Sequence, residues 1–316
     1  MENLTSNEDL LILEGLKVTP QSKTPAFILL LLVYIFIIVS NLGLVALIFG
    51  SRSLHQPMYL LFCNLLINDA CGATLLIPHI LKDIFISPSK RYIHYISCVA
   101  QAFCAHFLGS AAHTVLMIMA FDRYVAICNP LRYASIMTNR MVVKLSVAAW
   151  GSAFVTVAIL LGLTIRLSRC RRNLPNLFCD NASLFSLSCE SVIINNIYGL
   201  GYTVLLLGSS IGSITLTYLK IAAVCVRSKN NALNRKALQT CASHLVVYVL
   251  LLLMGFIIIA LHRFPHLSVH RKLLPILGHI ITPALNAVIY GVQIKEIRER
   301  IKAVFHINVV TLMDSK

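Results

Sequence analysis

The sequence predicts an all-α membrane protein: a bundle of seven transmembrane helices followed by a short amphipathic C-terminal helix. Hydrophobic residues make up 58% of the 316 positions, and charged residues only 12%. A soluble domain normally carries about 25% charged residues. Seven long stretches contain almost no charged residues, and a basic amphipathic segment follows the last of them.

Each of the seven stretches is long enough to cross a membrane as a helix. A helix needs about 20 residues to span a hydrocarbon core of about 30 Å. The connections between the stretches are too short to fold separately, so we expect one membrane domain at 26–292, an N-terminal segment at 1–25 and a tail at 293–316. The stretches are 26–50, 58–81, 97–121, 145–165, 192–219, 237–261 and 273–292.

The N-terminal segment is polar and acidic and lacks the basic start and apolar core of a cleaved signal peptide. We therefore expect the first span to direct insertion. The sequons that begin at Asn3 and Asn181 can be glycosylated only in the lumen, which places the N-terminus outside. A multi-pass protein of the plasma membrane with an extracellular N-terminus is the resulting prediction.

After the seventh stretch, the segment from Val292 to Phe305 has isoleucines at 294, 297 and 301, with Lys and Arg between them. This helical spacing predicts a basic amphipathic helix on the membrane surface. The net charge of +15 is shared between both sides of the membrane, and we expect the inner basic segments to contact anionic lipid. The sequence shows no nucleic-acid-binding module.

An acid and a base, Asp122 and Arg123, stand at the inner end of the third stretch within MAFDRYVAICNPLRY, Met119–Tyr133. Contact with lipid phosphate would explain the arginine but not the acid before it. The whole segment resembles the signature of odorant receptors, within the rhodopsin-like G-protein-coupled receptors. Three further segments agree: PMY from Pro57, KALQTCASHL from Lys236 and PALNAVIY from Pro283.

The resemblance implies a receptor that binds a small-molecule odorant outside and activates a stimulatory G protein inside. It implies that Asp122 holds Arg123 at rest, next to Tyr124, and that activation releases the arginine. Tyr218 and Tyr290 match the tyrosines that line the opened pocket. An ion pair at a buried edge suits a switch, because its small net stabilisation lets modest differential binding tip the balance.

Asp69 lies in the middle of the second stretch, where a carboxylate is costly and usually functional. The alternative is a neutral, hydrogen-bonded acid that serves packing alone. The resemblance implies a polar network of Asp69, Asn41 and Asn286 that can hold a sodium ion. The family's Asn-Pro is Asn286-Ala287 here, so the kink of this span must rely on Pro283.

Four cysteines lie on the expected outer side, an even number that oxidation can join in three ways. They are Cys98, Cys170, Cys179 and Cys189. The resemblance selects Cys98–Cys179 and Cys170–Cys189. The other six are expected to be ordinary small apolar residues: Cys63, Cys71, Cys104, Cys128, Cys225 and Cys241.

Two basic residues are candidates for ligand binding, His106 and Arg263. They match positions at which the fish-like class I branch of odorant receptors contacts small acids. An arginine and a protonated histidine would together bind a carboxylate well. The alternative is a solvated Arg263 and a His106 that hydrogen-bonds a helix. On helical-face grounds the pocket lining would add Leu108, Ser110, Tyr202 and Leu206. Leu251–Met254 replaces the aromatic residues of many relatives, so the ligand range is expected to differ.

The sequence gives no support to an enzyme, a cofactor or a metal-dependent reaction. It contains no H-E-x-x-H, no phosphate-binding glycine loop and no nucleophile elbow. His262, His266 and His270 recur at helical spacing, but Pro265 interrupts the helix between the first two. A transporter or channel would need internal repeats and several intramembrane ionisable residues. A seven-helix receptor outside olfaction is the nearer alternative, which tissue expression would separate.

Overall fold

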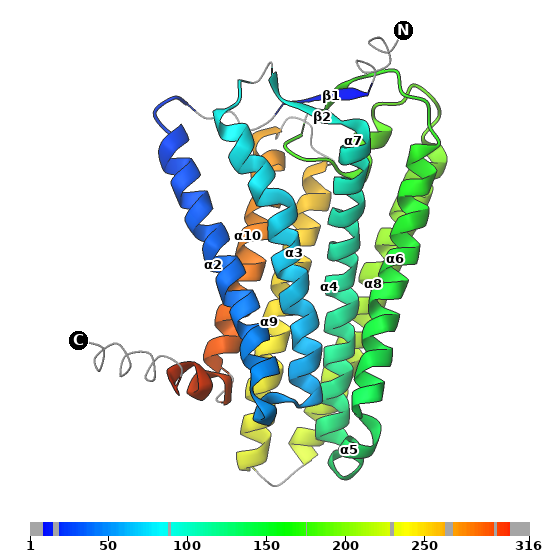
Figure 1. Cartoon of the computed structure of the whole chain (residues 1–316). Coiled ribbons are helices and arrows are strands. Elements are labelled where there is room, and N and C mark those ends of the chain that lie inside the picture. Colours follow the sequence, from blue (N-terminus) through cyan, green and yellow to red (C-terminus); the bar gives the residue numbers. More distant parts are fainter. Residues whose placement is uncertain are drawn as a thin grey trace, which may run out of the picture.

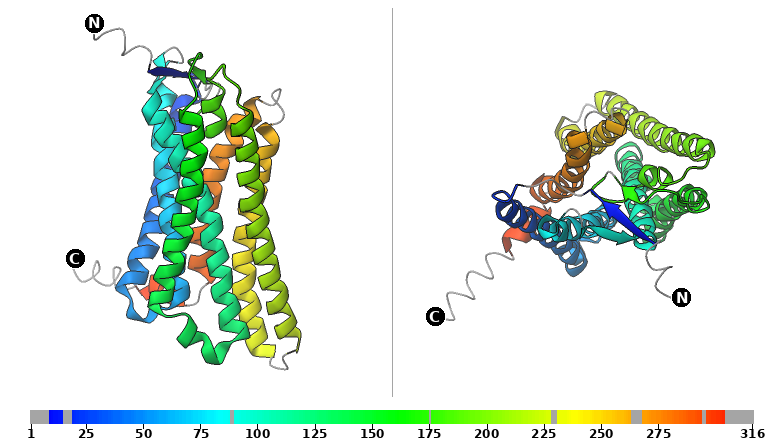
Figure 2. Two further views of the ribbon diagram at one scale, coloured as in Figure 1. Left: turned by 90° about the vertical axis from the view of Figure 1, so that its right-hand side faces the viewer. Right: turned by 90° about the horizontal axis from the view of Figure 1, so that it is seen from above.

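The computed structural model describes residues 9–14, 19–87, 90–174, 176–227, 231–262, 268–293 and 296–303. These residues form seven long helices packed side by side in one bundle (Figures 1 and 2). The helices are α2 (Lys23–Gly50), α3 (Pro57–Phe85), α4 (Tyr95–Cys128), α6 (Asn139–Ile165), α8 (Ile193–Arg227), α9 (Asn231–His262) and α10 (Ser268–Gln293). The predicted seven-helix bundle is confirmed.

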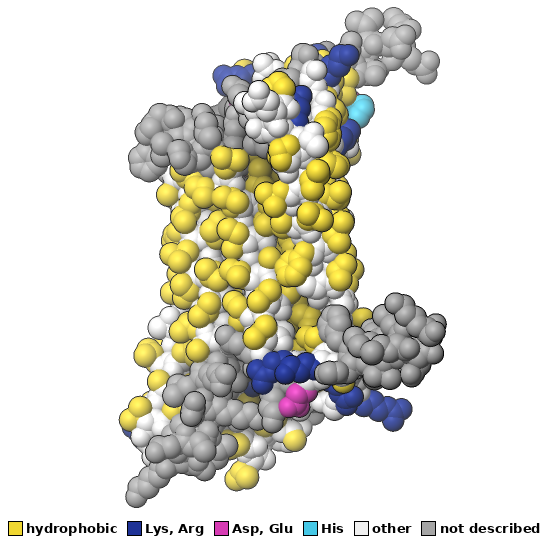
Figure 3. Space-filling model, turned by 90° about the vertical axis from the view of Figure 1, so that its left-hand side faces the viewer, with side chains coloured by type: hydrophobic (Ala, Val, Ile, Leu, Met, Phe, Trp, Pro, Cys, Tyr) yellow, Lys and Arg dark blue, Asp and Glu magenta, His cyan; other side chains and the backbone are white. Residues whose placement is uncertain are grey.

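The surface of the bundle has the pattern expected of a membrane protein. Six of the described helices are long and apolar enough to cross a membrane by themselves. The seventh candidate is Ile276–Val292 of α10 taken with the helix Glu296–Ala303, which is bent from it by 89°. Figure 3 shows apolar side chains over the middle of one face, with Lys and Arg gathered at its two ends. The chain is therefore a multi-pass membrane protein.

Local sequence explains where two of the helices start. Pro57 occupies the first turn of α3, where its missing N–H costs nothing. Thr138 caps α6 by accepting a hydrogen bond from the backbone N–H of Met141 at 3.2 Å. α4 and α8 run past the apolar stretches of the sequence, to Cys128 and Arg227, because helices continue into the polar zone beyond the lipid.

The larger core cluster lies in the inner half of the bundle and joins all seven long helices. Phe62 of α3 packs on Tyr290 of α10, with ring centroids 4.2 Å apart. Lipid tails are as apolar as leucine, so helix association here depends on close van der Waals packing rather than on removal of surface from water. The inner half thus holds the cluster of buried residues that links all seven long helices.

A small sheet closes the outer end of the bundle, and the sequence analysis did not predict it. Within the described residues, β1 (Leu10–Leu13) lies between β2 (Tyr92–His94), which runs antiparallel to it, and β3 (Asn173–Leu174), which runs parallel. Leu11 and Leu13 are each only 1% exposed. The N-terminal segment expected to be merely polar thus supplies a strand with a buried face.

The segment after α10 follows the prediction as far as it is described. Glu296–Ala303 is helical and lies at the end of the bundle opposite β1 (Figure 1, red). Ile297 is fully buried, and Ile301 packs against the inner core. Its bend of 89° from α10 is the orientation that a helix on the membrane surface would have.

Candidate functional site

A cavity of about 460 Å³ lies in the outer half of the bundle, between helices α3, α4, α8, α9 and α10. This volume lies within the range of sites that bind small molecules. The cavity is bordered by five residues that the sequence analysis placed in the pocket: His106, Leu108, Ser110, Tyr202 and Leu206. The sixth, Arg263, lies outside the described residues. Leu251 and Met254, where relatives carry aromatic residues, also border the cavity.

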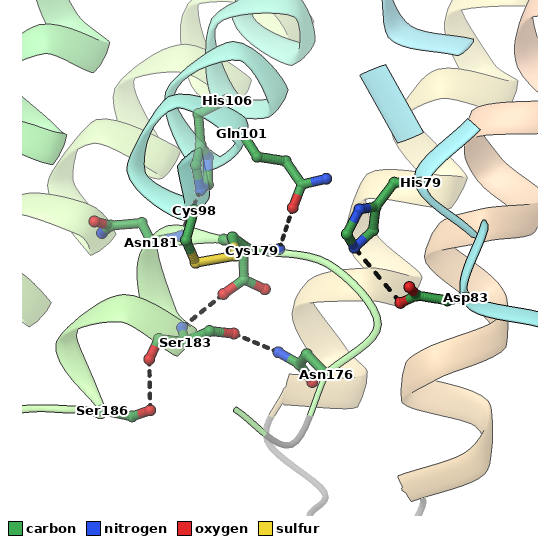
Figure 4. The surroundings of a disulfide bond; sticks show 11 residues. His79, Asp83, Cys98, Gln101, His106, Asn176, Cys179, Asn181, Ser183 and Ser186 are labelled. Atoms are coloured by element: carbon green, nitrogen blue, oxygen red, sulfur yellow. Dashed lines mark hydrogen bonds and ion pairs between the residues drawn. A yellow bond between two sulfur atoms is a disulfide. The ribbon is translucent and has the colours of Figure 1, made fainter. Parts of the chain in front are cut away.

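The roof of the cavity is the loop between α6 and α8, with the short helix α7 (Asn181–Phe185). The described residues hold two disulfides, Cys98–Cys179 and Cys170–Cys189, the pairs that the resemblance implies. Gln101 of α4 accepts a hydrogen bond from the Cys179 backbone N–H at 2.9 Å (Figure 4). The roof is thus tied to α4 both covalently and through the backbone.

His106 borders the cavity, but its contacts differ from the expectation of a protonated histidine. Its Nε2 accepts a hydrogen bond from the backbone N–H of Asn181 at 3.2 Å (Figure 4). A nitrogen that accepts a hydrogen bond carries no proton, so the ring is not an imidazolium. His106 thus holds the roof in place, and its part in binding a carboxylate stays a prediction.

The prediction of a glycan at Asn181 does not fit the structure. Asn181 is only 5% exposed, and its Oδ1 accepts a hydrogen bond from Thr164 Oγ1 at 2.7 Å. Ser183, which completes the sequon, is buried as well. An attached sugar would have to displace the roof from the bundle. Asn3, in the other sequon, lies outside the described residues.

Ser110 and Tyr202 share a hydrogen bond across the cavity wall, from α4 to α8. Ser110 Oγ also donates to the backbone oxygen of His106 at 2.9 Å. A serine hydroxyl has one proton, so Tyr202 is the donor in the shared bond. Both hydroxyls therefore already have protein partners.

Two of the three members of the expected network, Asp69 and Asn286, meet directly. Asn286 Nδ2 donates to Asp69 Oδ2 at 2.7 Å, and both residues border the deep end of the cavity. Asn41 Nδ2 donates instead to the backbone oxygens of Ile37 and Pro283, at 2.9 and 3.4 Å. Its buried Oδ1 has no hydrogen-bond partner among the described residues. These carboxylate and amide oxygens are ligands of the kind that a hard cation prefers, so they fit a sodium ion.

The sequence analysis missed a second histidine on the same helix, His113, which also borders the cavity. Ser210 of α8 lies between His113 Nδ1, at 3.3 Å, and the hydroxyl of Tyr248 on α9, at 2.7 Å. A signal was present in the sequence, because His113 follows His106 by two helical turns and therefore lies on the same face of the helix.

At the inner end, Asp122 and Arg123 form the expected ion pair. Arg123 Nε donates to Asp122 Oδ2 at 2.9 Å, and the carboxylate is fully buried. The hydroxyl of Tyr133, in α5 (Tyr133–Ile136), donates to Asp122 Oδ1 at 2.8 Å. Burial, and next the charge of Asp122, raise the pKa of Tyr133, so its hydroxyl stays protonated and keeps donating at neutral pH. Tyr133 is thus a third member of this cluster.

The other expected switch residues surround the ion pair. Tyr218 bonds His244 Nδ1 through its hydroxyl at 2.6 Å. Tyr124 lies with its ring centroid 5.5 Å from Lys220 Nζ. Tyr290 borders, with Arg123 and His244, a hollow of only about 10 Å³. That space holds about one water molecule, so the described side chains around Arg123 are closely packed.

Comparison with known proteins decides the family. The family described as "Olfactory receptor" matches residues 30–307. The chain belongs to the olfactory receptor family. It is 33% identical to olfactory receptor 52N2 of Homo sapiens, over 84% of either chain. With the olfactory receptor-like protein COR4 of Gallus gallus, identity is also 33%, over 94% of this receptor and 95% of the relative.

The fold of the receptor agrees with this assignment. Squid rhodopsin superposes with a TM-score of 0.72 over 92% of this receptor and 83% of the squid chain, at 17% identity. The receptor is therefore an odorant-sensing G-protein-coupled receptor, with a small-molecule ligand and a G protein as its partners, and it is not an enzyme. Family membership also favours a receptor over the transporter or channel considered from sequence.

Proposed function

We propose that this receptor binds a small odorant in the cavity beneath the α7 roof and then activates a stimulatory, olfactory-type G protein at its inner end. The single observation that carries this proposal is the pairing of an outer cavity of about 460 Å³ with a closed inner end held by Asp122 and Arg123. A ligand site and an effector site at opposite ends of one bundle are what transmembrane signalling requires.

The receptor acts in the plasma membrane with its N-terminus and the α7 roof outside. Two disulfides at the roof support this orientation, because such bonds persist in an oxidising compartment. Cys128 and Cys241, near the opposite end, form no disulfide, as the reducing side favours. Anionic lipid of the inner leaflet then faces Glu296–Ala303 with its basic residues.

Signalling follows from a difference in affinity between a closed and an open bundle. An odorant that binds the open bundle more tightly shifts the population toward it, by as much as that difference in affinity. In the open bundle Arg123 leaves Asp122, and the space now closed by Tyr290 and His244 admits the G protein. The ion pair suits this role, because the cost of desolvating its charges offsets most of their attraction.

Any response of the receptor to carboxylic acids would then depend on Arg263, the other basic residue expected at the pocket. Arg263→Ala should then weaken the response to a carboxylic acid and leave the response to the aldehyde of the same length unchanged. Equal losses for acid and aldehyde would remove the carboxylate hypothesis.

The proposal is tested by Arg123→Ala in cells that report cyclic AMP. We expect the odorant-evoked signal to be lost while the variant still reaches the cell surface. Arg140→Ala is the matched control, because Arg140 is an exposed arginine near the same end of the bundle. A cyclic AMP response that persists in Arg123→Ala would contradict the proposal.

A further inference from the structure

Three buried polar side chains at the deep end of the cavity have no part in the proposal above. His113 on α4, Ser210 on α8 and Tyr248 on α9 are 7%, 0% and 3% exposed. Ser210 hydrogen-bonds both of the others, and the rings of His113 and Tyr248 meet edge to face, with centroids 6.3 Å apart. One chain of hydrogen bonds therefore joins three helices beneath the ligand site.

The direction of these hydrogen bonds follows from the available acceptors. Each hydroxyl, and a neutral histidine ring, has one proton to donate. Ser210 is the hydrogen-bond partner of the Tyr248 hydroxyl in the described part of the chain, so Tyr248 donates to Ser210. Ser210 then donates to His113 Nδ1, and its contact with the Leu207 oxygen, at 3.4 Å, is longer. An accepting Nδ1 puts the ring proton on Nε2.

Hydrogen bonds that run in the opposite direction, from His113 to Ser210, would be less stable. If His113 donated to Ser210, the serine proton would go to Tyr248 or to Leu207. The Tyr248 proton would then have no acceptor among the residues described. A buried donor that loses its acceptor costs more than one ordinary hydrogen bond gains. The arrangement from Tyr248 through Ser210 to His113 is therefore favoured.

We propose that His113 is a specificity-determining residue whose Nε2–H donates to the odorant. The cavity then takes neutral odorants with an apolar body and a carbonyl oxygen, such as aldehydes and ketones. His113 borders the cavity, and its Nε2 has no hydrogen-bond partner among the described residues. The inference rests on the proposed function, because it takes this cavity as the odorant site.

The rest of the cavity explains why the preferred oxygen is neutral. Leu116, Val247 and Leu251 give it an apolar wall, where a hydrogen bond is stronger than in water. Asp69 borders the same cavity and would repel an odorant carboxylate if ionised. One N–H donor also leaves most of a carboxylate's acceptor sites unpaired, whereas a carbonyl needs only one donor.

Three other polar side chains of the cavity are already paired with protein. Nε2 of His106 accepts from Asn181, and the hydroxyls of Ser110 and Tyr202 bond each other. A site built to hydrogen-bond one ligand group rejects analogues that lack it, because the buried donor stays unpaired. An alkane of the same length should therefore bind less well than the aldehyde.

The experiment uses straight-chain aldehydes, acids and alkanes of matched length, with octanal, octanoic acid and octane as the central set. Cyclic AMP is measured in cells that express the full receptor, and potency is compared at equal surface expression. In the wild type we expect aldehydes to be the most potent of each set. In His113→Leu we expect aldehyde potency to fall about tenfold and alkane potency to stay unchanged.

Tyr248→Phe tests the chain of hydrogen bonds that fixes the proton on Nε2, since it removes one hydroxyl and keeps the ring. We expect a loss of aldehyde potency of roughly threefold. Ser210→Ala should act in the same direction. Ser209→Ala, at the exposed neighbour of Ser210, and His55→Leu, in an exposed turn at the inner end, are matched controls that should change nothing.

Several results would overturn the inference. The first is that acids are the most potent probes of the wild type. The second is that the wild type reaches the cell surface but responds to no member of the series. The third is that His113→Leu loses aldehyde and alkane potency equally, which would indicate a role in packing alone. If His113→Leu fails to reach the surface, Tyr248→Phe decides, and an unchanged ratio of aldehyde to alkane potency refutes the inference. Failure of the proposed function differs from all of these, because responses would then persist in Arg123→Ala.

Discussion

The two ends of the bundle are closed by different kinds of interaction. The outer end is fixed by two disulfides and by a strand of the N-terminal segment between β2 and β3. At the inner end, the described residues are joined by side-chain contacts: the pair of Asp122 and Arg123 with Tyr133, and the bond between Tyr218 and His244. Covalent and sheet constraints persist when a ligand binds, whereas side chains can exchange partners. The inner end is thus the part expected to rearrange.

The polar groups on the α4 wall of the cavity and those beside Arg123 also differ in charge. Around the cavity, the hydroxyls and the His106 ring are neutral and hydrogen-bonded to one another or to backbone. At the inner end, a buried carboxylate faces a guanidinium. Neutral hydrogen bonds in an apolar cavity give selectivity among ligands. A charge pair with small net stabilisation gives two states of similar free energy.

The largest effect is expected where the outer end is opened. Removing Cys98–Cys179 releases a loop closed over a sequence separation of 81, against 19 for Cys170–Cys189. Chain entropy then predicts losses of about 4.5 and about 3.2 kcal/mol of stability. Thermal unfolding of the two double Cys→Ser variants in detergent measures this. If the variant without Cys98–Cys179 were the more stable of the two, the link between the roof and α4 would not be the main constraint at the outer end.

The next effect concerns the inner end. Asp122→Asn keeps the size of the side chain and removes the charge that holds Arg123, so the closed state should lose about 1.5–3 kcal/mol. Basal cyclic AMP should therefore rise about tenfold or more without odorant. Asp180→Asn is a control at the outer end, where Asp180 caps α7. Unchanged basal signalling at normal surface expression in Asp122→Asn would contradict the claim that this pair stabilises the closed state.

A smaller effect of the same sign is expected for Tyr133→Phe. The variant removes the hydroxyl that donates to Asp122 at 2.8 Å and keeps the ring. Loss of this hydrogen bond should weaken the closed state by about 1 kcal/mol and raise basal cyclic AMP roughly fivefold. Tyr92→Phe, in an exposed position of β2, is the matched control. A fall in basal signal would show that Tyr133 favours the open state instead.

The smallest effect is expected at the sequon of the roof. Since Asn181 is buried, Asn181→Gln should not change the electrophoretic mobility of the receptor from cells, and enzymatic deglycosylation should remove nothing attached there. Asn3→Gln, at the other sequon, is the comparison and should abolish any shift that deglycosylation produces. A mobility change in Asn181→Gln would show that a glycan is attached to Asn181 before the roof packs on the bundle.

Sequence was sufficient where a physical requirement is strong and local. Seven apolar stretches define the bundle because a span must satisfy its own backbone in lipid. The pair of Asp122 and Arg123 stood out because charge is costly beside hydrocarbon. The cavity residues Ser110, Tyr202 and Leu206 followed from the faces that their helices present.

Sequence was insufficient where the outcome depends on contacts between distant segments. The strand Leu10–Leu13 forms because it pairs with β2 and β3. The sequence of these four residues does not reveal which distant segments they pair with. The state of His106 depends on an Asn181 backbone group 75 positions away. His113 was missed because a histidine within an apolar stretch looks like core until Ser210 and Tyr248 are seen beside it.

The most direct test measures the distance between the inner ends of α4 and α9. Spin labels are introduced through unnatural amino acids at two exposed positions, Arg132 after α4 and Ala242 on α9. We predict that the distance between the labels lengthens when a saturating odorant agonist is added, because Arg123 leaves Asp122 and the hollow beside Tyr290 opens. A distance that stays unchanged while the same agonist raises cyclic AMP would contradict the account.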